Sequence, residues 1–326
     1  MLEGKRILVT GGAGFIGSNL CEFLVEKNEV RCLDSLLTGH QENIQHLLDH
    51  PQFTFIKGDV RDYEVCLNAT EGVDVIFHQA ALGSVPRSIE TPLNTNAHNV
   101  TGFLNMLEAA KNSNVKRFVF ATSSSVYGDH EHLPKTEGKI GKPLSPYAVT
   151  KYVNEMYADV YARLYGIETI GLRYFNVFGR RQDPNGVYAA VIPRFVKLLQ
   201  EGKAITVNGD GEQTRDFTYI DNVIQANVLA ATVEDSAALN TIYNIGCGST
   251  ITLNELIQAI QECFKENDFS EGAFEVIYGP KRKGDIEHSY ASIAKATEFL
   301  KYNPTIDLKE GMRRYLGVLI ENELSN

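Results

Sequence analysis

Hydrophobic and polar residues follow two different periods along the first half of the chain. Short runs of mostly apolar residues have the character of buried strands, and between them apolar residues recur every three or four positions, as on one face of a helix. This pattern predicts strands at residues 5–10, 29–33, 53–57, 73–77, 117–122 and 168–174, and helices at residues 15–27, 41–49, 62–70, 96–113 and 147–165. Such a regular alternation predicts an α/β fold with a doubly wound parallel sheet.

The pattern changes after Asn176. The second half is predicted to hold short strands near residues 204–207, 215–219 and 241–245, and helices near residues 189–200, 221–232, 252–265 and 307–320. This indicates a smaller, mixed α/β lobe, so that residues 1–176 form one domain and residues 177–326 a second. No linker rich in Pro, Gly or Ser separates the halves, and we therefore expect an interleaved boundary.

A glycine-rich loop, Gly11–Gly17, connects the first predicted strand to the first predicted helix. Glycines in such a loop permit a tight turn, let a pyrophosphate approach the backbone, and let the helix pack closely on the strand. The free N–H groups at the start of the helix then face the phosphates. Because strand, loop and helix follow one another in this order, the loop predicts a dinucleotide-binding domain of the Rossmann type.

Residues at the ends of the second and fourth predicted strands add to this prediction. Asp34 lies about 20 residues after Gly14, where an acid binds the adenosine ribose hydroxyls. A carboxylate there would repel a 2′-phosphate, so NAD is favoured over NADP. The small residues of His78-Gln79-Ala80-Ala81 would let a flat cofactor lie against the sheet edge. His78 could be a ligand or a base, but a hydrogen-bonded histidine at a strand end is the favoured interpretation.

Tyr147 and Lys151 form the second informative pattern. They lie one helical turn apart, so the phenol and the ammonium share a helix face. A free tyrosine has a pKa of about 10, and a nearby cation favours the phenolate and lowers that pKa. Ser123 follows the apolar strand predicted at residues 117–122, where it could pass a substrate proton to Tyr147. Together the three residues predict a base for oxidising a sugar alcohol near neutral pH.

Composition narrows the class of protein. The 326 residues are 43% hydrophobic and carry a formal net charge of −10, which argues against nucleic-acid binding. No run of about 20 apolar residues could span a bilayer, and no signal peptide precedes the first strand, so we expect no membrane association and a cytoplasmic location. Scattered free thiols fit a reducing compartment. His130-Glu131-His132 is too short and loop-like for a metal site, and no metal is expected.

These motifs resemble the extended short-chain dehydrogenase/reductase family that acts on nucleotide sugars, and within it the UDP-N-acetylhexosamine 4-epimerases. The resemblance covers essentially the whole chain. The segments that carry it are Gly11–Gly17, Asp34, Gly58–Val60, His78–Ala81, Gly83–Ser88, Ser123–Gly128, Tyr147 with Lys151, Arg173–Gly179, Ala189–Pro193, Gly209–Gly211, Arg215–Phe217 and Tyr243–Gly246. Two positions depart from the family pattern: Ser35 stands where many relatives have Asn, and Arg180 where Pro is common.

The resemblance implies a set of functional residues. Ser123, Tyr147 and Lys151 would be catalytic. The residues implied for NAD binding are Gly11, Gly14, Phe15, Ile16, Gly17, Asp34, Ser35, Thr38, Gly39, Asp59, Val60, Gln79, Ala80, Ala81, Thr122, Tyr147, Lys151, Tyr174 and Val177. The residues implied for UDP-sugar binding are Gly83, Ser84, Val85, Ser123, Ser124, Ser125, Tyr147, Asn176, Ala190, Val191, Thr206, Asn208, Arg215, Arg282, Asp285 and Ser289.

The resemblance also implies a reaction. Tyr147 would take the proton of the sugar 4-hydroxyl with the help of Ser123, while a hydride passes from C4 to NAD and returns to the opposite face. Lys151 would hold the nicotinamide ribose and lower the pKa of Tyr147. Sugar-nucleotide dehydratases carry an acid where this chain has Ser125, which disfavours elimination. Ser289 is small at the position beside the sugar C2 substituent, which favours an N-acetyl group.

Two alternatives remain beside the epimerase. One is another NAD-dependent nucleotide-sugar enzyme, namely an epimerase for UDP-glucose or UDP-glucuronate, a dehydratase or a reductase. The other, which the presence of all three catalytic residues disfavours, is a non-enzymatic NAD-binding scaffold. The helices near residues 96–113 and 147–165 carry apolar residues on more than one side, and family members pair these helices. A homodimer is therefore expected.

Overall fold

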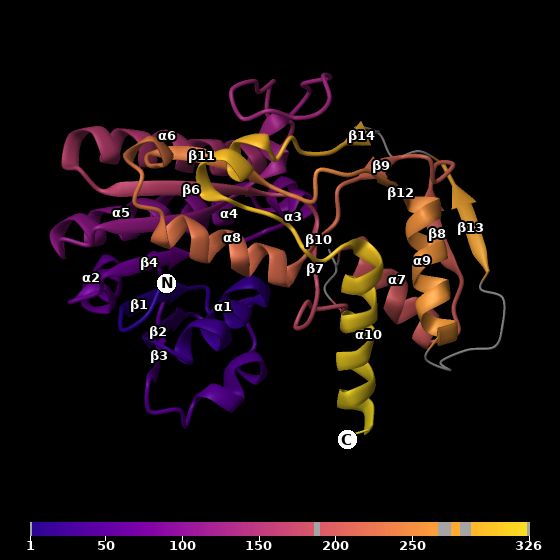
Figure 1. Cartoon of the computed structure of the whole chain (residues 1–326), viewed down its shortest axis with the longest axis horizontal. Helices are drawn as coiled ribbons and strands as arrows, with labels where there is room; N and C mark the ends of the chain where they lie inside the picture. Colours follow the sequence, from indigo (N-terminus) through magenta and orange to yellow (C-terminus); the bar gives the residue numbers. More distant parts are fainter. Residues whose placement is uncertain (1, 186–189, 267–274, 281–287, 325–326) are drawn as a thin grey trace.

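The computed structural model describes residues 2–185, 190–266, 275–280 and 288–324. Its largest element is a seven-stranded sheet in which every neighbouring pair of strands is parallel (Figure 1). Across the sheet the strands are β11 (Thr241–Ile245), β6 (Glu168–Tyr174), β5 (Arg117–Ser123), β4 (Val75–His78), β1 (Arg6–Thr10), β2 (Glu29–Asp34) and β3 (Phe53–Lys57). The predicted doubly wound parallel sheet is confirmed.

Alternation along the buried strands gives the sheet two apolar faces. Ile7 and Val9 of β1 face the layer that holds Leu20, whereas Leu8 between them faces the layer that holds Phe103. Strands that are covered on both faces have nearly continuous runs of apolar residues in the sequence. The first face is covered by α1 (Phe15–Val25) and α8 (Ile220–Thr232), and the second by α2 (Tyr63–Thr70), α5 (Gly102–Asn112) and α6 (Pro146–Tyr165).

Helical segments also border the second face ahead of α5. The chain forms α3 (Val85–Glu90) and α4 (Pro92–Asn96), and a π-helical turn at Ala97–Thr101 leads into α5. The helix predicted near residues 96–113 is therefore real but interrupted. Residues 41–49, predicted as a helix, form a 3-10 turn at Gln41–Leu47, a tighter and usually short form of helix.

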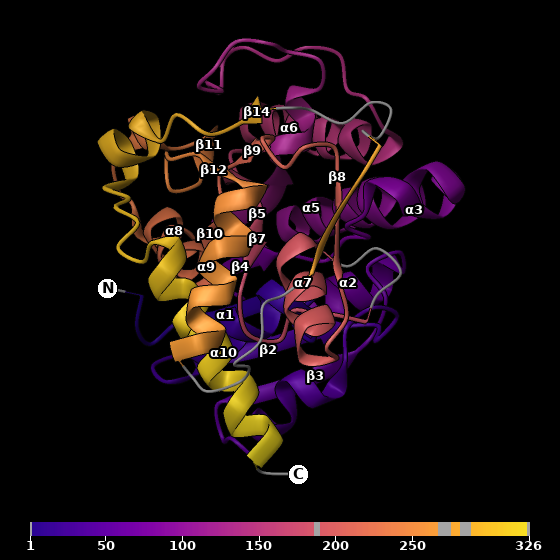
Figure 2. The same cartoon turned by 90° about the vertical axis from the view of Figure 1, so that its right-hand side faces the viewer.

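The smaller lobe lies beside the sheet, on the right of Figure 1, and Figure 2 shows the same lobe facing the viewer. Its helices are α7 (Val191–Gln200), α9 (Leu253–Glu266) and α10 (Leu308–Leu324). Its short strands are β7 (Val177–Phe178), β8 (Ile205–Asn208), β9 (Thr214–Arg215), β10 (Thr218–Tyr219), β12 (Ile251–Thr252), β13 (Val276–Gly279) and β14 (His288–Ser289), which form small sheets of two or three strands.

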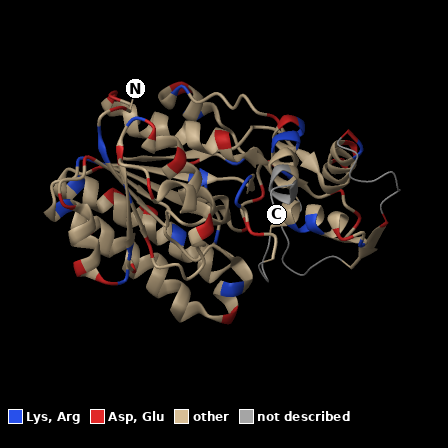
Figure 3. Cartoon of the chain, turned by 90° about the horizontal axis from the view of Figure 1, so that it is seen from below, with Lys and Arg blue, Asp and Glu red and all other residues tan. Residues whose placement is uncertain are grey.

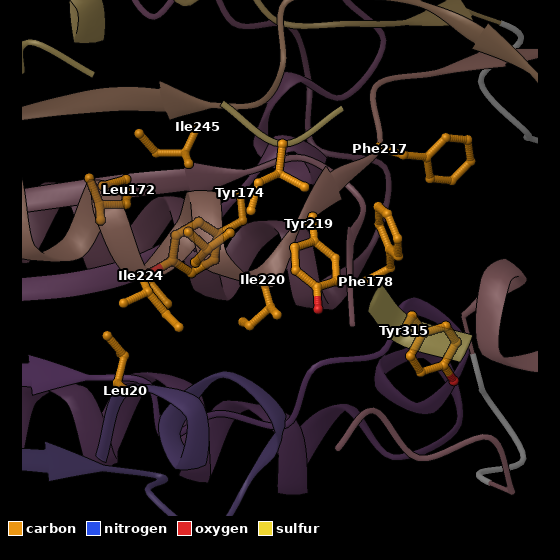
Figure 4. Packing of buried hydrophobic residues seen from close by; sticks show 14 of the residues in the cluster. Leu20, Leu172, Tyr174, Phe178, Phe217, Tyr219, Ile220, Ile224, Ile245 and Tyr315 are labelled. Carbon is orange, nitrogen blue, oxygen red and sulfur yellow. The ribbon is translucent and has the colours of Figure 1, made fainter. Parts of the chain in front are cut away.

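The two halves of the chain share one core. The sequence placed residues 241–245 in the smaller lobe, but β11 pairs with β6 and forms an edge of the main sheet. Helix α8 likewise packs on the main sheet, and Ile220 and Ile224 lie near Leu20 of α1 (Figure 4). The chain therefore returns to the first domain after it has begun the second.

Figure 3 shows positions of Lys and Arg interspersed with positions of Asp and Glu along the chain. Within the described residues, no helix is both long and apolar enough to cross a membrane. None of the five cysteines, all of which lie within the described residues, forms a disulfide, and four of them are buried. The expectation of free thiols is confirmed.

Candidate active site

A pocket of about 350 Å³ lies at the carboxyl ends of β1, β2 and β4, and we call it the strand-end pocket. Ligands of open parallel sheets bind at this edge, where the chain order reverses between neighbouring strands, here β1 and β4. The glycine loop forms one wall. Gly11 has φ of 66°, and a Cβ on Gly17 would lie 2.1 Å from the Gly11 carbonyl oxygen. Only glycine fits these two positions, so the loop has the close turn that a dinucleotide phosphate requires.

Most residues that the sequence assigned to NAD line this pocket. They are Gly11, Gly14, Phe15, Ile16, Gly17, Asp34, Ser35, Thr38, Gly39, Asp59, Val60, Gln79, Ala80, Ala81, Thr122, Tyr147, Lys151 and Tyr174. Val177 lines a different pocket. Gly83, assigned to the sugar nucleotide, lies in the strand-end pocket together with residues that the sequence did not assign to a site: Leu33, Leu37, Gly58, Leu82, His98 and Ala121.

Asp34 is held at the end of β2 by backbone donors. Its carboxylate accepts hydrogen bonds from the Ala13 N–H at 3.0 Å and the Leu36 N–H at 2.8 Å. Burial raises the pKa of Asp34, although these two hydrogen bonds oppose the shift. The acid is thus fixed beside the glycine loop, where the sequence expects the adenosine ribose.

The His78 side chain is buried and does not line the strand-end pocket. Its Nδ1 lies 2.9 Å from the Thr10 hydroxyl, and its ring packs between Phe103 and Phe118. Burial, with a smaller contribution from the Lys151 charge, lowers the pKa of His78 to about 3, so the ring is neutral. The favoured interpretation, a hydrogen-bonded histidine at a strand end, is confirmed.

Tyr147 and Lys151 project from the first two turns of α6 into the strand-end pocket. Pro146 suits the first position of a helix, and the Ser145 hydroxyl accepts a hydrogen bond from the Ala148 N–H at 3.2 Å, which caps the helix. Lys151 is only 3% exposed, and its Nζ donates to the Ala121 carbonyl at 3.0 Å. The helix start therefore determines where the phenol and the ammonium lie.

The pKa values of this pair shift in opposite directions. Burial lowers the pKa of Lys151 to about 8, and the charge of Glu155 opposes that shift. Burial raises the pKa of Tyr147, while a hydrogen bond with Ser123 lowers it. The expectation that the pKa of Tyr147 lies below its usual value is wrong for this structure, because burial of the phenol dominates. With a pKa of about 8, Lys151 is mostly in its charged form near neutral pH.

A second pocket, of about 300 Å³, lies in the smaller lobe, and we call it the lobe pocket. It contains seven positions that the sequence assigned to the sugar nucleotide or to NAD: Asn176, Val177, Ala190, Val191, Thr206, Asn208 and Arg215. Asn176 has a positive φ of 29°, and its side chain donates to the Asp216 carbonyl at 2.9 Å. At the end of β6, Tyr174 lines the strand-end pocket, and Asn176, two residues later, lines the lobe pocket. The two pockets therefore meet the same strand end.

The remaining assigned residues that the structure describes lie outside the walls of both pockets. Ser123, Ser124 and Ser125 form the turn after β5, where the Ser123 hydroxyl accepts from the Ser125 N–H at 3.2 Å. Ser84 caps α3 by accepting from the Arg87 N–H, with Val85 beginning that helix. Ser289 pairs in register with Arg215. Arg282 and Asp285 lie outside the described residues.

The sequence analysis missed several apolar residues of the lobe pocket. They are Phe178, Ile192, Phe195, Val207, Phe217 and Leu253. Phe217 belongs to a motif that the sequence did single out, Arg215-Asp216-Phe217, and an aromatic between polar residues is a usable signal. Phe178 and Ile192 also lie within motifs that the sequence singled out, whereas Phe195, Val207 and Leu253 belong to ordinary apolar runs that carry no such signal.

The chain matches the NAD dependent epimerase/dehydratase family over residues 7–246. It is 41% identical to the putative UDP-glucose 4-epimerase of Methanocaldococcus jannaschii over 319 residues, which cover 97% of this chain and 99% of that relative. A solved UDP-N-acetylglucosamine 4-epimerase from Methanobrevibacter ruminantium, in complex with UDP-N-acetylmuramic acid, has a TM-score of 0.91 and 36% identity over 98% of this chain and 99% of its own. UDP-glucuronic acid 4-epimerase from Bacillus cereus, solved in complex with UDP-glucuronic acid and NAD, has a TM-score of 0.88 and 31% identity over 97% of this chain and 99% of its own.

Proposed function

Because the chain belongs to the NAD dependent epimerase/dehydratase family, we propose that it interconverts UDP-N-acetylglucosamine and UDP-N-acetylgalactosamine by inverting sugar C4. NAD is the cofactor, and UDP-sugar 4-epimerases are among its relatives. The observation that carries the proposal is that Tyr147 and Lys151 line the strand-end pocket together with Tyr174 at the end of β6. Asn176, two residues further along the chain, lines the lobe pocket.

The strand-end pocket fits a dinucleotide. The tight glycine loop would hold the pyrophosphate, and Asp34 would accept hydrogen bonds from the adenosine ribose. Bound NAD would supply a hydride acceptor and donor for sugar C4, together with a positive charge near the phenol. Since an acid at the ribose disfavours a 2′-phosphate, purified protein is expected to contain NAD rather than NADP.

The residues around the sugar would move its proton. Tyr147 would take the proton of the 4-hydroxyl and later return it, because the phenolic oxygen is the basic group that faces the pocket. Ser123, whose side chain lowers the pKa of Tyr147, would relay that proton. The Lys151 ammonium would stabilise the phenolate, whose formation burial makes unfavourable.

The lobe pocket would hold the UDP group while the sugar turns over. Asn176, Thr206 and Asn208 offer hydrogen-bonding groups, and Arg215 offers a planar fork that suits a diphosphate. The apolar side chains Phe178, Phe195 and Phe217 give a flat base a surface to pack against. Anchoring at one end would leave the 4-keto sugar free to present either face.

Small residues support the N-acetyl preference. Ser289 lies next to β9 in register with Arg215, and Ala190 lines the lobe pocket. Neither would fill the space beside the sugar C2 substituent. UDP-glucose is the second candidate substrate, because the relative with 41% identity bears the name of a UDP-glucose 4-epimerase. UDP-glucuronate is a third candidate substrate, because the similar Bacillus cereus structure is that of a UDP-glucuronic acid 4-epimerase.

The proposed function is tested by incubating the purified protein, without added cofactor, separately with UDP-N-acetylglucosamine, UDP-glucose and UDP-glucuronate. Proton NMR should show the C4 epimer of each accepted substrate, with the highest kcat/KM for the N-acetyl sugar. A 4-keto product or released NADH would instead indicate a dehydratase or reductase. A higher kcat/KM for either other sugar would overturn the proposed preference.

A homodimer is part of the same proposal. Of the two helices predicted to pair, the one at residues 147–165 exposes Met156, which is 46% exposed; on α3 and α4, which pack against it, Ile89 is 62% exposed and Leu93 86%. A cluster of such residues is costly in water and is typical of an interface. Light scattering should give twice the chain mass, and Leu93→Glu should lower it to the monomer mass. A monomeric wild type would contradict this proposal.

A further inference from the structure

Three consecutive residues at the end of β5 contact three groups on one face of α6. The Ser123 side chain lowers the pKa of the Tyr147 phenol, and the Ala121 carbonyl accepts from Lys151 Nζ at 3.0 Å. Between them, the Thr122 hydroxyl donates to Glu155 Oε1 at 2.7 Å. Tyr147, Lys151 and Glu155 are each one helical turn apart, so they share this face. The Tyr147–Lys151 pair is thus the first part of a row that ends in a buried carboxylate.

The carboxylate of Glu155 is held from the neighbouring strand β6. Arg173 Nε donates to Oε1 at 2.9 Å and Nη2 donates to Oε2 at 2.7 Å, with both side chains at most 6% exposed. Arg173 is itself fixed by the Glu137 carbonyl at 3.1 Å and by the ring of Tyr127, 4.9 Å from the guanidinium carbon. A two-point contact of this kind leaves the carboxylate one orientation.

Several titratable groups surround Lys151. Tyr147 and Glu155 come from its own helix, and His78, which is neutral, comes from β4. Tyr174 of β6 and His98 of the π-helical turn line the same pocket, and Arg173 faces Glu155 from β6. Among these groups Glu155 is the anion, and its charge opposes the effect of burial on the pKa of Lys151.

We propose that Glu155, oriented by Arg173 and Thr122, is a positioning residue that keeps Lys151 in its ammonium form beside Tyr147. Burial alone favours a neutral lysine, because the low-dielectric interior disfavours an isolated charge. A carboxylate one turn away offsets this cost. Arg173 fixes the distance of that carboxylate from the lysine and prevents Glu155 from pairing directly with the ammonium and drawing it away from the pocket.

The alternative is that Arg173 and Glu155 only brace α6 against the sheet. The two interpretations predict different effects of the two single substitutions on the titration of Lys151. Glu155→Gln would leave the Arg173 cation uncompensated near Lys151, whereas Arg173→Gln would leave the Glu155 anion uncompensated. A brace would be broken equally by both substitutions, but only an electrostatic role would shift the lysine titration in opposite directions.

The experiment follows Lys151 directly in the NAD-loaded protein. Lysine labelled with ¹³C at Cε is incorporated, and the Lys151 resonance is identified by its loss in Lys151→Met. We expect Glu155→Gln to lower the lysine titration midpoint by about one pH unit, Arg173→Gln to raise it, and the double variant to restore it towards wild type. Shifts of both single variants in the same direction, or no shift in either, would overturn the proposal.

Glu155→Asp covers the case in which the single variants do not fold, since removing one partner of a buried pair is costly. This variant keeps the charge and the arginine contact but shortens the side chain. We expect a smaller downward shift of the Lys151 midpoint than for Glu155→Gln, and an unchanged midpoint would contradict the proposal.

The role proposed for Glu155 rests on the proposed epimerase function only where it is tested by a second measurement, the pH dependence of kcat/KM. The alkaline limb of kcat/KM should move with the Lys151 midpoint in each variant. If the protein epimerises none of the sugars tested, the NMR titration still decides the role of Glu155, so the two failures are distinguishable.

Discussion

The strand-end pocket and the lobe pocket are built in different ways. The first is lined mainly by residues of four short stretches that directly follow strands of the main sheet: 11–17 after β1, 35–39 after β2, 58–60 after β3 and 79–83 after β4. The second is lined by short stretches and single residues from segments between Asn176 and Leu253 that belong to different small sheets and helices. A site at the ends of parallel strands can therefore be recognised from local motifs, whereas the lobe pocket exists only once distant segments have packed.

The largest expected effect is on the chemical step at the strand-end pocket. Tyr147→Phe should lower kcat by at least about a hundredfold, because the proton of the 4-hydroxyl then has no acceptor. The variant should keep its fold and its NAD, since the phenol oxygen does not build the glycine loop. Turnover is measured by NMR and cofactor content by absorbance after denaturation. Tyr152→Phe, on the same helix, is the control and should retain activity; equal activity of both variants would contradict the role of Tyr147.

Next in size is the loss of the cofactor itself. A Cβ on Gly17 would meet the Gly11 carbonyl oxygen at 2.1 Å and Gly12 Cα at 2.8 Å, and both are backbone atoms that cannot turn aside. Gly17→Ala should therefore abolish NAD retention and lower Tm, and added NAD should not restore activity. Gly138→Ala, where a Cβ would meet nothing within 4 Å, is the matched control. Full NAD content in Gly17→Ala would contradict the assignment of the loop.

An intermediate effect should separate the two pockets. Arg215→Lys should raise KM for the UDP-sugar about tenfold, because lysine offers no planar fork for a diphosphate. NAD content and the Tm of the NAD-loaded protein should stay close to wild type, since Arg215 lines only the lobe pocket among the two. Loss of NAD in this variant would show that the two pockets do not act independently.

The smallest effect concerns the choice of sugar. Ser289→Tyr should lower kcat/KM for UDP-N-acetylglucosamine several-fold more than for UDP-glucose, because the larger side chain excludes what no longer fits. Ser289→Ala, which adds no bulk, serves as the control. A variant that keeps the wild-type ratio of the two kcat/KM values would remove Ser289 from the argument for an N-acetyl preference.

Local sequence predicted the parts of the molecule that depend on local structure. The parallel strands and the glycine loop follow from apolar runs and glycine spacing, and both are present. The helix predicted at residues 41–49 is a 3-10 turn, since helical spacing alone does not separate the two forms. The pKa of Tyr147 was misjudged because its burial comes from the whole pocket and not from its neighbour on the helix. His98 and Phe195 reach the pockets through tertiary packing, which no spacing rule encodes.

The return of the chain to β11 has a consequence for how this protein is made. The edge of β6 stays unpaired until residues 241–245 have left the ribosome, well after the rest of the sheet has been synthesised. An unpaired strand edge is a template for association with other chains. The nascent first half is therefore expected to depend on slow, protected synthesis or chaperone binding, and a fragment that ends at residue 176 should aggregate unless residues 241–245 are supplied as a separate peptide.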